Sequence, residues 1–241
     1  MQLQSTDVMI PIRESEMGAY LAAPSVPKGS LVLIQEIFGV TPAMRAIADD
    51  LASEGYAVLV PDIYWRLARS LDLGNGEDPA ERQLAVDYSN RYDEQLGTQD
   101  LVNAWQWLSG RFPGTGSAAI AGLCLGGRLA VRVAAAADVS CMISLYGVGL
   151  DKLAAELAAT KAPVQLHYGE NDNHNPMAVI EAVRGLVASR DDTRDEFFTY
   201  PEAEHAFYNR FRLDRFDQAA HTLARQRMLS FLARHTARHP S

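Results

Sequence analysis

Cysteine is scarce in this sequence, and its scarcity excludes two classes of protein. Only two cysteines occur among 241 residues, too few for a scaffold held together by disulfides. Cys124 and Cys141 do not form a C-x-x-C pair, and no Cys/His cluster has the ligand spacing of a structural zinc site. We therefore expect a cytoplasmic protein with free thiols and with neither a metal nor another cofactor.

Positive charge is also in the minority. The chain has 22 Lys and Arg residues against 30 Asp and Glu residues, a formal net charge of −8, and no block of basic residues. This balance argues against a surface for nucleic acid or for anionic membranes. No apolar run reaches the roughly 18 residues of a membrane span, and the first residues lack the basic and apolar regions of a signal peptide.

The chain does contain a regular alternation of apolar runs and helical patterns. The apolar runs begin at about residues 29, 56, 117, 139, 163 and 196. The alternation predicts an α/β fold, with a mostly parallel sheet covered by helices on both faces, and residues 7–24 predict an N-terminal hairpin. Because no linker or repeat interrupts the pattern, we expect one domain over residues 1–241. Ligands of such sheets bind beyond the carboxyl ends of the strands.

Local signals place several helix boundaries. Thr41 followed by Pro42 predicts the start of a helix that stops at Gly55. The polar stretch around residues 66–83 predicts an excursion past the sheet edge, with a helix from about Pro79. Further helices are expected at 98–110, 125–137 and 176–190, and a last one from about 214 to 235.

The stretch AGLCLGGR, residues 121–128, places Cys124 between a predicted strand and a predicted helix. Gly122 and Gly126 complete a G-x-C-x-G pattern, which is a nucleophile elbow with cysteine in place of serine. A helix N-terminus there favours a thiolate and leaves the Leu125 amide free to bind an oxyanion. We interpret Cys124 as a nucleophile, with a small buried core residue as the alternative. A dinucleotide fingerprint is excluded, since Cys124 occupies the place of its second glycine.

A thiol nucleophile needs a base and an orienting carboxylate, which follow it in this fold class in the order acid, then histidine. His205 lies at the end of the last predicted strand and is the expected base. Asp172 lies in the loop after the strand at 163–169, and we favour it over Glu170 as the acid. The remaining histidines fit the role less well: His167, His174, His221, His235 and His239.

The segments QEIFG, PDIY, GLCLGG, YGVGL and HAF together resemble the dienelactone hydrolase family of the α/β-hydrolase superfamily, from about Leu31 to the end of the chain. The resemblance implies a monomeric enzyme that opens a small unsaturated lactone carrying a carboxylate, through a thioester on the cysteine. It implies that Glu36 contacts the thiol and helps to deprotonate it when substrate enters. The implied triad is Cys124, Asp172 and His205, and the implied oxyanion hole consists of the amides of Ile37 and Leu125.

The family also binds the substrate carboxylate with arginines, and here the sequence departs from the pattern. Arg82 matches the first arginine. The second arginine position, four residues past the histidine, holds Asn209, so the adjacent Arg210 would substitute for it only if the loop shifts. Val86 and Ser89 stand where the family has aromatic pocket residues.

The leading hypothesis is a cysteine-dependent hydrolase of a small lactone or ester, of the carboxymethylenebutenolidase type. Its partner would be a small, carboxylated molecule rather than nucleic acid or a membrane. Two alternatives stay open. One is a broader hydrolase of small esters or thioesters, which the departure at Asn209 favours, and the other is a ligand- or redox-sensing protein in which Cys124 is a reactive thiol.

Overall fold

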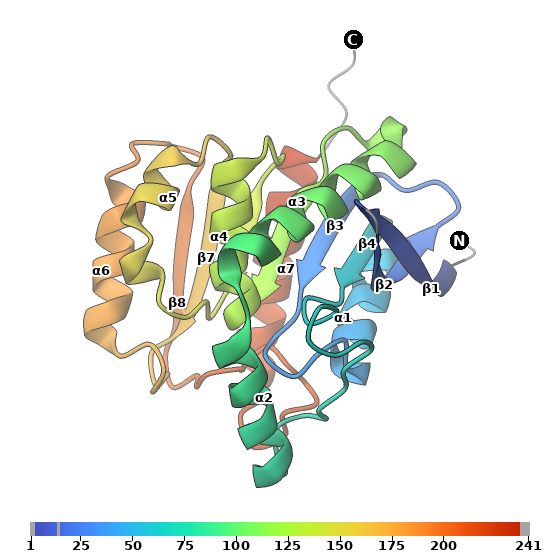
Figure 1. The fold of residues 1–241 in the computed structure, drawn as a ribbon. Coiled ribbons are helices and arrows are strands. Elements are labelled where there is room, and N and C mark those ends of the chain that lie inside the picture. Colours follow the sequence, from blue (N-terminus) through green and yellow to red (C-terminus); the bar gives the residue numbers. More distant parts are fainter. Residues whose placement is uncertain (1–2, 14, 237–241) are drawn as a thin grey trace.

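An eight-stranded sheet forms the centre of the computed structural model, which describes residues 3–13 and 15–236 (Figure 1). β1 pairs with β2, and β2 with β4, in antiparallel fashion, and every other pair of neighbours is parallel. The predicted hairpin and mostly parallel sheet are therefore confirmed. Across the sheet the strands are β1 (Leu3–Ile12), β2 (Ser15–Pro24), β4 (Tyr56–Pro61), β3 (Gly29–Ile34), β5 (Ala119–Leu123), β6 (Met142–Leu145), β7 (Val164–Gly169) and β8 (Glu196–Tyr200).

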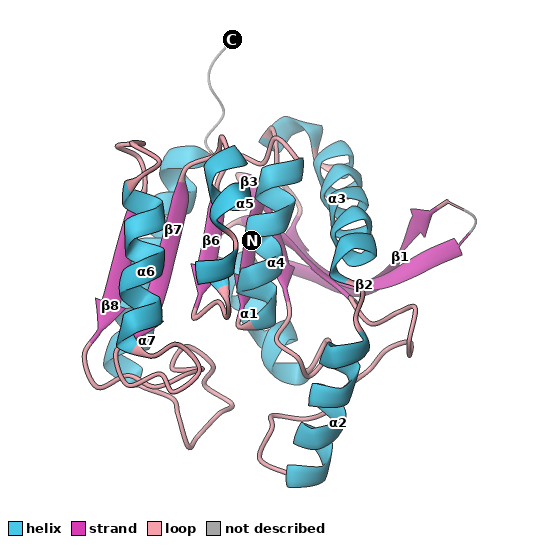
Figure 2. Ribbon diagram, turned by 60° about the vertical axis from the view of Figure 1, so that its left-hand side comes forward, coloured by secondary structure: helices cyan, strands magenta, loops and turns pink. Residues whose placement is uncertain are grey.

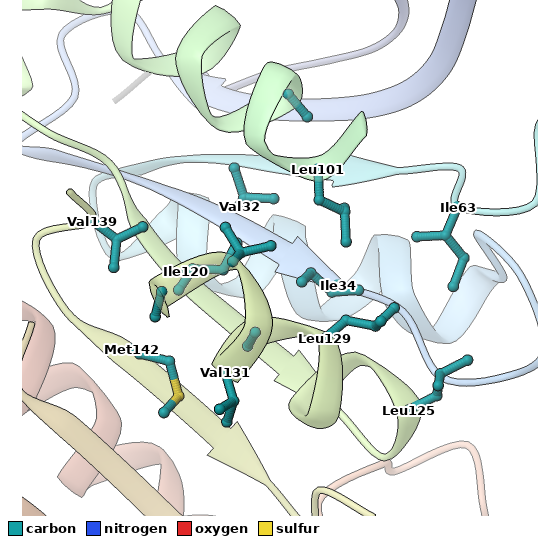
Figure 3. Packing of buried hydrophobic residues seen from close by; sticks show 14 of the residues in the cluster. Val32, Ile34, Ile63, Leu101, Ile120, Leu125, Leu129, Val131, Val139 and Met142 are labelled. Atoms are coloured by element: carbon teal, nitrogen blue, oxygen red, sulfur yellow. The ribbon is translucent and has the colours of Figure 1, made fainter. Parts of the chain in front are cut away.

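Helices cover both faces of the sheet. One face carries α3 (Glu94–Arg111), α4 (Leu125–Ala136), α5 (Ala154–Ala159) and α6 (Met177–Ala188), and the other carries α1 (Pro42–Ser53) and α7 (Gln218–His235). Figure 3 shows the first core, in which strand residues such as Val32 and Ile120 pack against Leu101 and Leu129 of the helices. Short 3₁₀ helices occur at Pro113–Thr115 and Leu150–Lys152.

Helix α2 (Pro79–Arg91) differs from the others because it projects beyond the carboxyl ends of the strands (Figure 2). Of its side chains only Ala85 is buried. The segment before it is tied to the loop between β8 and α7, since the Asn75 amide donates to the Phe211 carbonyl at 3.1 Å. The predicted excursion is confirmed, and it lies beside the loop that carries His205.

Capping side chains set the helix boundaries. The Thr41 hydroxyl accepts from the Met44 amide, as the sequence predicts. The helix expected at 98–110 begins earlier, at Glu94, because the Asp93 carboxylate accepts from the amides of residues 95 and 96. The last helix begins later than expected, because Asp217 caps it and residues 201–217 form turns. Of the histidines considered above, His239 lies outside the described residues.

Within residues 3–13 and 15–236, no helix is long and apolar enough to cross a bilayer. The same part of the chain contains no group of three or more His, Cys, Asp and Glu side chains arranged to hold a metal ion.

A fully buried histidine on β7 makes the fold sensitive to acid. His167 contacts the Tyr200 hydroxyl at 2.7 Å and the Gln165 side-chain oxygen at 2.9 Å, and burial lowers its pKa from 6.5 to about 3. Because the unfolded chain binds this proton near pH 6.5, stability is complete above that pH and falls as the pH drops toward 3. Between pH 7 and pH 5 we expect His167 to cost about 2 kcal/mol of unfolding free energy.

Urea unfolding of the wild type and of His167→Gln at both pH values measures this effect. The variant should lose about 2 kcal/mol less than the wild type on acidification. An equal loss in the two proteins would assign the acid sensitivity to other groups.

Candidate active site

The carboxyl ends of five parallel strands bring the candidate residues to one edge of the sheet. Each follows its strand directly or within a few residues, and all are at least partly buried. These residues are Glu36 after β3, Cys124 after β5, Tyr146 after β6, Asp172 after β7 and His205 after β8.

Cys124 occupies a sharp turn between β5 and α4. Its φ and ψ are 55° and −116°, a strained conformation for a residue with a side chain. A Cβ at Gly122 would lie 2.0 Å from the Gly126 carbonyl oxygen, and one at Gly126 would lie 2.3 Å from the Ile34 carbonyl oxygen. Both glycines are therefore required by close backbone contacts. Leu125 is the first residue of α4, so its N–H has no acceptor within the helix.

His205 and Asp172 form a buried pair, with 2.8 Å between Nδ1 and Oδ2. The Asp172 carboxylate also accepts from the His174 amide at 2.8 Å and from the Asn175 side chain at 2.9 Å. Burial alone would raise the pKa of Asp172, but the bonds from these groups, His205 foremost, lower it. Glu170, the alternative acid, instead accepts from the Thr199 hydroxyl at 2.8 Å.

The electrostatics of His205 favour the imidazolium. Burial acts to lower its pKa, but the negative charges of Cys124 and Asp172 outweigh burial and hold the pKa well above its ordinary value. The structure thus brings the three residues of the expected triad together, in the order in which the chain supplies them.

Glu36 is only 5% exposed, and both of its carboxylate oxygens are hydrogen-bonded. Oε1 accepts from the Tyr146 hydroxyl at 3.2 Å, and Oε2 accepts from the Asn209 side-chain amide at 2.9 Å. The expected contact with the thiol is not among the hydrogen bonds that Glu36 makes within the described residues.

Cys124 opens into a cavity of about 140 Å³ at this edge of the sheet. A larger cavity, of about 350 Å³, lies between the β1–β2 hairpin and α1, away from these residues. We place the candidate site in the smaller one because it contains Cys124 and His205, the expected nucleophile and base. Its lining residues are Glu36, Ile37, Phe38, Arg82, Val86, Cys124, His174, His205, Arg212 and Arg215.

Three arginines line this cavity, and two of them differ from the sequence-based expectation. Arg82 is present as expected, and its Nε donates to the Gly76 carbonyl at 2.8 Å. Arg210 is exposed and lies outside the lining, because the turn after Asn209 directs it to solvent. Arg212, whose side chain is 8% exposed, and Arg215 occupy the wall instead.

Sequence reasoning missed Arg212 and Arg215 because their placement depends on the tertiary path of the loop. Backbone bonds from Asn209 to Ala206 and from Arg212 to Asn209 coil the chain back over the cavity. The neighbouring Arg215 pairs with Glu204 at 3.1 Å. A cluster of arginines shortly after the histidine was the only signal in the sequence.

His174 is a second histidine in the cavity wall, with its ring centroid 4.5 Å from that of His205. Burial, and then the positive charge of His205, lower its pKa. His174 is therefore neutral at pH 7 and offers the substrate a hydrogen-bonding group beside the base.

The parallel sheet, the strained turn before α4 and the buried histidine–carboxylate pair define an α/β-hydrolase with a cysteine in the nucleophile position. More narrowly, the chain belongs to the dienelactone hydrolase family, whose model matches residues 17–236. It is therefore an ester hydrolase of the dienelactone hydrolase type.

Individual relatives are similar over nearly their whole length. The chain is 35% identical over 219 residues to carboxymethylenebutenolidase 1 of Cupriavidus pinatubonensis, covering 90% of this chain and 91% of that protein. It is 32% identical over 217 residues to carboxymethylenebutenolidase of Pseudomonas putida, covering 90% of each. A crystal structure from Klebsiella pneumoniae named for the same family matches with a TM-score of 0.83 and 27% identity, covering 97% of this chain and 99% of that one.

Proposed function

We propose that this chain hydrolyses a small, carboxylated lactone of the carboxymethylenebutenolide type, with Cys124 as the nucleophile. The observation that carries the proposal is the composition of one cavity. It holds Cys124 on a strained turn, the buried pair of His205 and Asp172, and three guanidinium groups. We propose further that the enzyme is a cytoplasmic monomer, since one chain supplies every group that the reaction needs.

In the first step, Cys124 Sγ forms a bond to the lactone carbonyl carbon. The negative charge that develops on the carbonyl oxygen accepts hydrogen bonds from the amides of Ile37 and Leu125. Collapse of this intermediate breaks the bond between the carbonyl carbon and the ring oxygen. The ring oxygen leaves as an enolate, which is a good leaving group, and the imidazolium of His205 supplies its proton.

In the second step, water attacks the thioester carbonyl carbon. His205, now neutral, takes a proton from the water, and Asp172 holds the imidazole in the required orientation and stabilises its charged form. The C–S bond then breaks, which releases a dicarboxylic acid and returns the thiolate to Cys124.

The cavity wall supports an anionic substrate of this size. The lining holds three guanidiniums and one carboxylate, Glu36, which is already bonded to Tyr146 and Asn209. Two of the guanidiniums also pair with carboxylates outside the lining, Arg212 with Asp214 and Arg215 with Glu204. Arg82 bonds to a backbone carbonyl, so its positive charge is available to a ligand carboxylate. A cavity of about 150 Å³ holds a ring the size of benzene, so 140 Å³ suits a single small lactone ring.

Arg212→Ala tests the substrate class. For the carboxylated lactone we expect KM to rise about tenfold or more, the effect of losing a hydrogen bond between charged groups. For the same ring without the carboxylate, kcat/KM should change less than about threefold, since Arg212 then has no substrate anion to bind and keeps only its ion pair with Asp214. Steady-state kinetics on both lactones measure the difference.

Arg210→Ala is the matched control, because Arg210 is exposed and outside the cavity lining. It should leave both sets of constants unchanged. Equal losses on the two lactones in Arg212→Ala would refute carboxylate recognition by this residue and favour a broader small-ester hydrolase.

A further inference from the structure

Glu36 is an unusual neighbour for a thiolate nucleophile. It is a buried carboxylate in the same cavity as Cys124, and a negative charge there opposes a second one on sulfur. Two unit charges about 4 Å apart repel by about 1 kcal/mol even in water, and by more at the effective dielectric of a protein. The direction in which the Glu36 carboxylate is held therefore affects the reactivity of the cysteine.

Two neutral donors fix that direction. The Asn209 side chain, 2% exposed, donates to Oε2, and the fully buried Tyr146 hydroxyl donates to Oε1. The orientation of Asn209 is itself determined, because its oxygen accepts from the Phe211 amide at 3.0 Å and its nitrogen must then face Glu36. The Tyr146 ring packs edge-on against His205, with centroids 5.0 Å apart.

We propose that Asn209 is a positioning residue that, together with Tyr146, holds the Glu36 carboxylate away from Cys124, so that the cysteine is reactive before substrate binds. The inference depends on the proposed role of Cys124 as nucleophile. It differs from an activation in which an entering substrate brings Glu36 to the thiol, because both Glu36 oxygens are already hydrogen-bonded. The imidazole of His205 stays paired with Asp172, at 2.8 Å, in this arrangement.

The alternative role for Asn209 is direct contact with the substrate. The two roles differ in what they require. Positioning acts through the charge of Glu36 and needs no substrate, whereas a binding contact is expressed only when the carboxylated lactone is present.

The test is the rate at which iodoacetamide alkylates Cys124 at pH 7 without substrate, followed by peptide mass mapping to separate Cys124 from the buried Cys141. In Asn209→Ala we expect this rate to fall about five- to tenfold, because the freed carboxylate turns toward the sulfur. In the double variant Asn209→Ala/Glu36→Gln the rate should return to within about twofold of Glu36→Gln alone, since the repelling charge is gone. A loss of packing would not be restored in this way.

Asn171→Ala is the control, since the Asn171 side chain is exposed and, among residues 3–13 and 15–236, donates hydrogen bonds to Glu202 alone. It should alkylate at the wild-type rate. Tyr146→Phe, which removes a single oxygen, serves as the second variant should Asn209→Ala not fold. In Tyr146→Phe, Cys124 should be alkylated more slowly than in the wild type. Adding Glu36→Gln should restore the alkylation rate in this variant as well.

An unchanged alkylation rate in Asn209→Ala overturns the proposal, and a raised KM for the carboxylated lactone in that variant would assign Asn209 to substrate binding. The proposal is also overturned if the alkylation rate of the double variant does not recover.

Lactone turnover is measured separately, so that this inference and the proposed function can fail independently. If alkylation is slow in Asn209→Ala and is restored by Glu36→Gln, but no lactone is hydrolysed, the positioning role is retained and the proposed substrate is rejected.

Discussion

Replacing Cys124 with alanine is expected to reduce kcat for lactone hydrolysis by at least about 10⁴-fold, the scale seen when a nucleophile is removed from a catalytic triad. The reason is that the other cavity-lining side chains lie outside the strained turn and are not aligned with His205 and the free amide of Leu125. Steady-state kinetics with the carboxylated lactone measure the loss. Mass spectrometry of the wild type after rapid quenching should show an acyl adduct on Cys124.

Cys141→Ala is the matched control. Cys141 is fully buried in the core on the α1 and α7 side of the sheet, and burial raises its pKa to about 12, so it is an unreactive thiol. Its replacement should leave kcat within about twofold, because Cys141 lies at the amino end of β6, whereas the cavity lies at the carboxyl ends of the strands. Retained hydrolysis in Cys124→Ala, or an oxidised Cys124 in an inactive wild type, would favour the sensory protein instead.

Gly126→Ala is expected to have the largest effect on stability. The added Cβ would lie 2.3 Å from the Ile34 carbonyl oxygen and 2.6 Å from that of Gln35, and because both are backbone atoms, no flexible group can move aside. Overpacking of this kind costs about 3 kcal/mol or more, so we expect a melting temperature lower by roughly 10 °C. Calorimetry measures the change, and kcat should fall as well because the turn carries Cys124.

Gly185→Ala provides the comparison. Gly185 lies inside α6, and an added Cβ would meet no heavy atom within 4 Å. This substitution should stabilise the protein by about 0.5–1 kcal/mol, since alanine is the better helix former. If both alanine variants melted like the wild type, the close packing of the elbow against β3 would be disproved.

The sequence was sufficient for most of the fold because each apolar run was long enough to mark a strand and helical patterns filled the intervals between the runs. It was less accurate where a cap was not recognised. Asp93 and Asp217 begin their helices a few residues away from the expected positions, because one capping side chain decides where the backbone bonds start. The strand expected to continue toward His205 ends at Tyr200, and turns follow it.

The candidate site likewise contains residues that could be predicted from the sequence and residues that could not. The proximity of Cys124, Asp172 and His205 could be predicted because strand ends in a parallel sheet converge whatever the loops do. Arg212 could not be found, since its place in the cavity depends on the turns between Ala206 and Arg212. The partners of Glu36 were equally out of reach, because Tyr146 and Asn209 are distant from it in the chain and meet it only through the packing of three loops.

The proposed catalytic residues and the arginines of the cavity wall lie on different parts of the fold, and this separation affects how substrate preference can change. The proposed catalytic residues follow the ends of the central strands, whereas Arg82 and Arg212 belong to α2 and to the loop before α7, which lie outside the sheet (Figure 1). Under the proposed function, we expect mutations near these two arginines to change which acid is selected without disturbing the elbow. We therefore expect a laboratory library restricted to residues 74–91 and 210–216 to explore new substrates, because it leaves Asn209, Glu36 and the elbow unchanged.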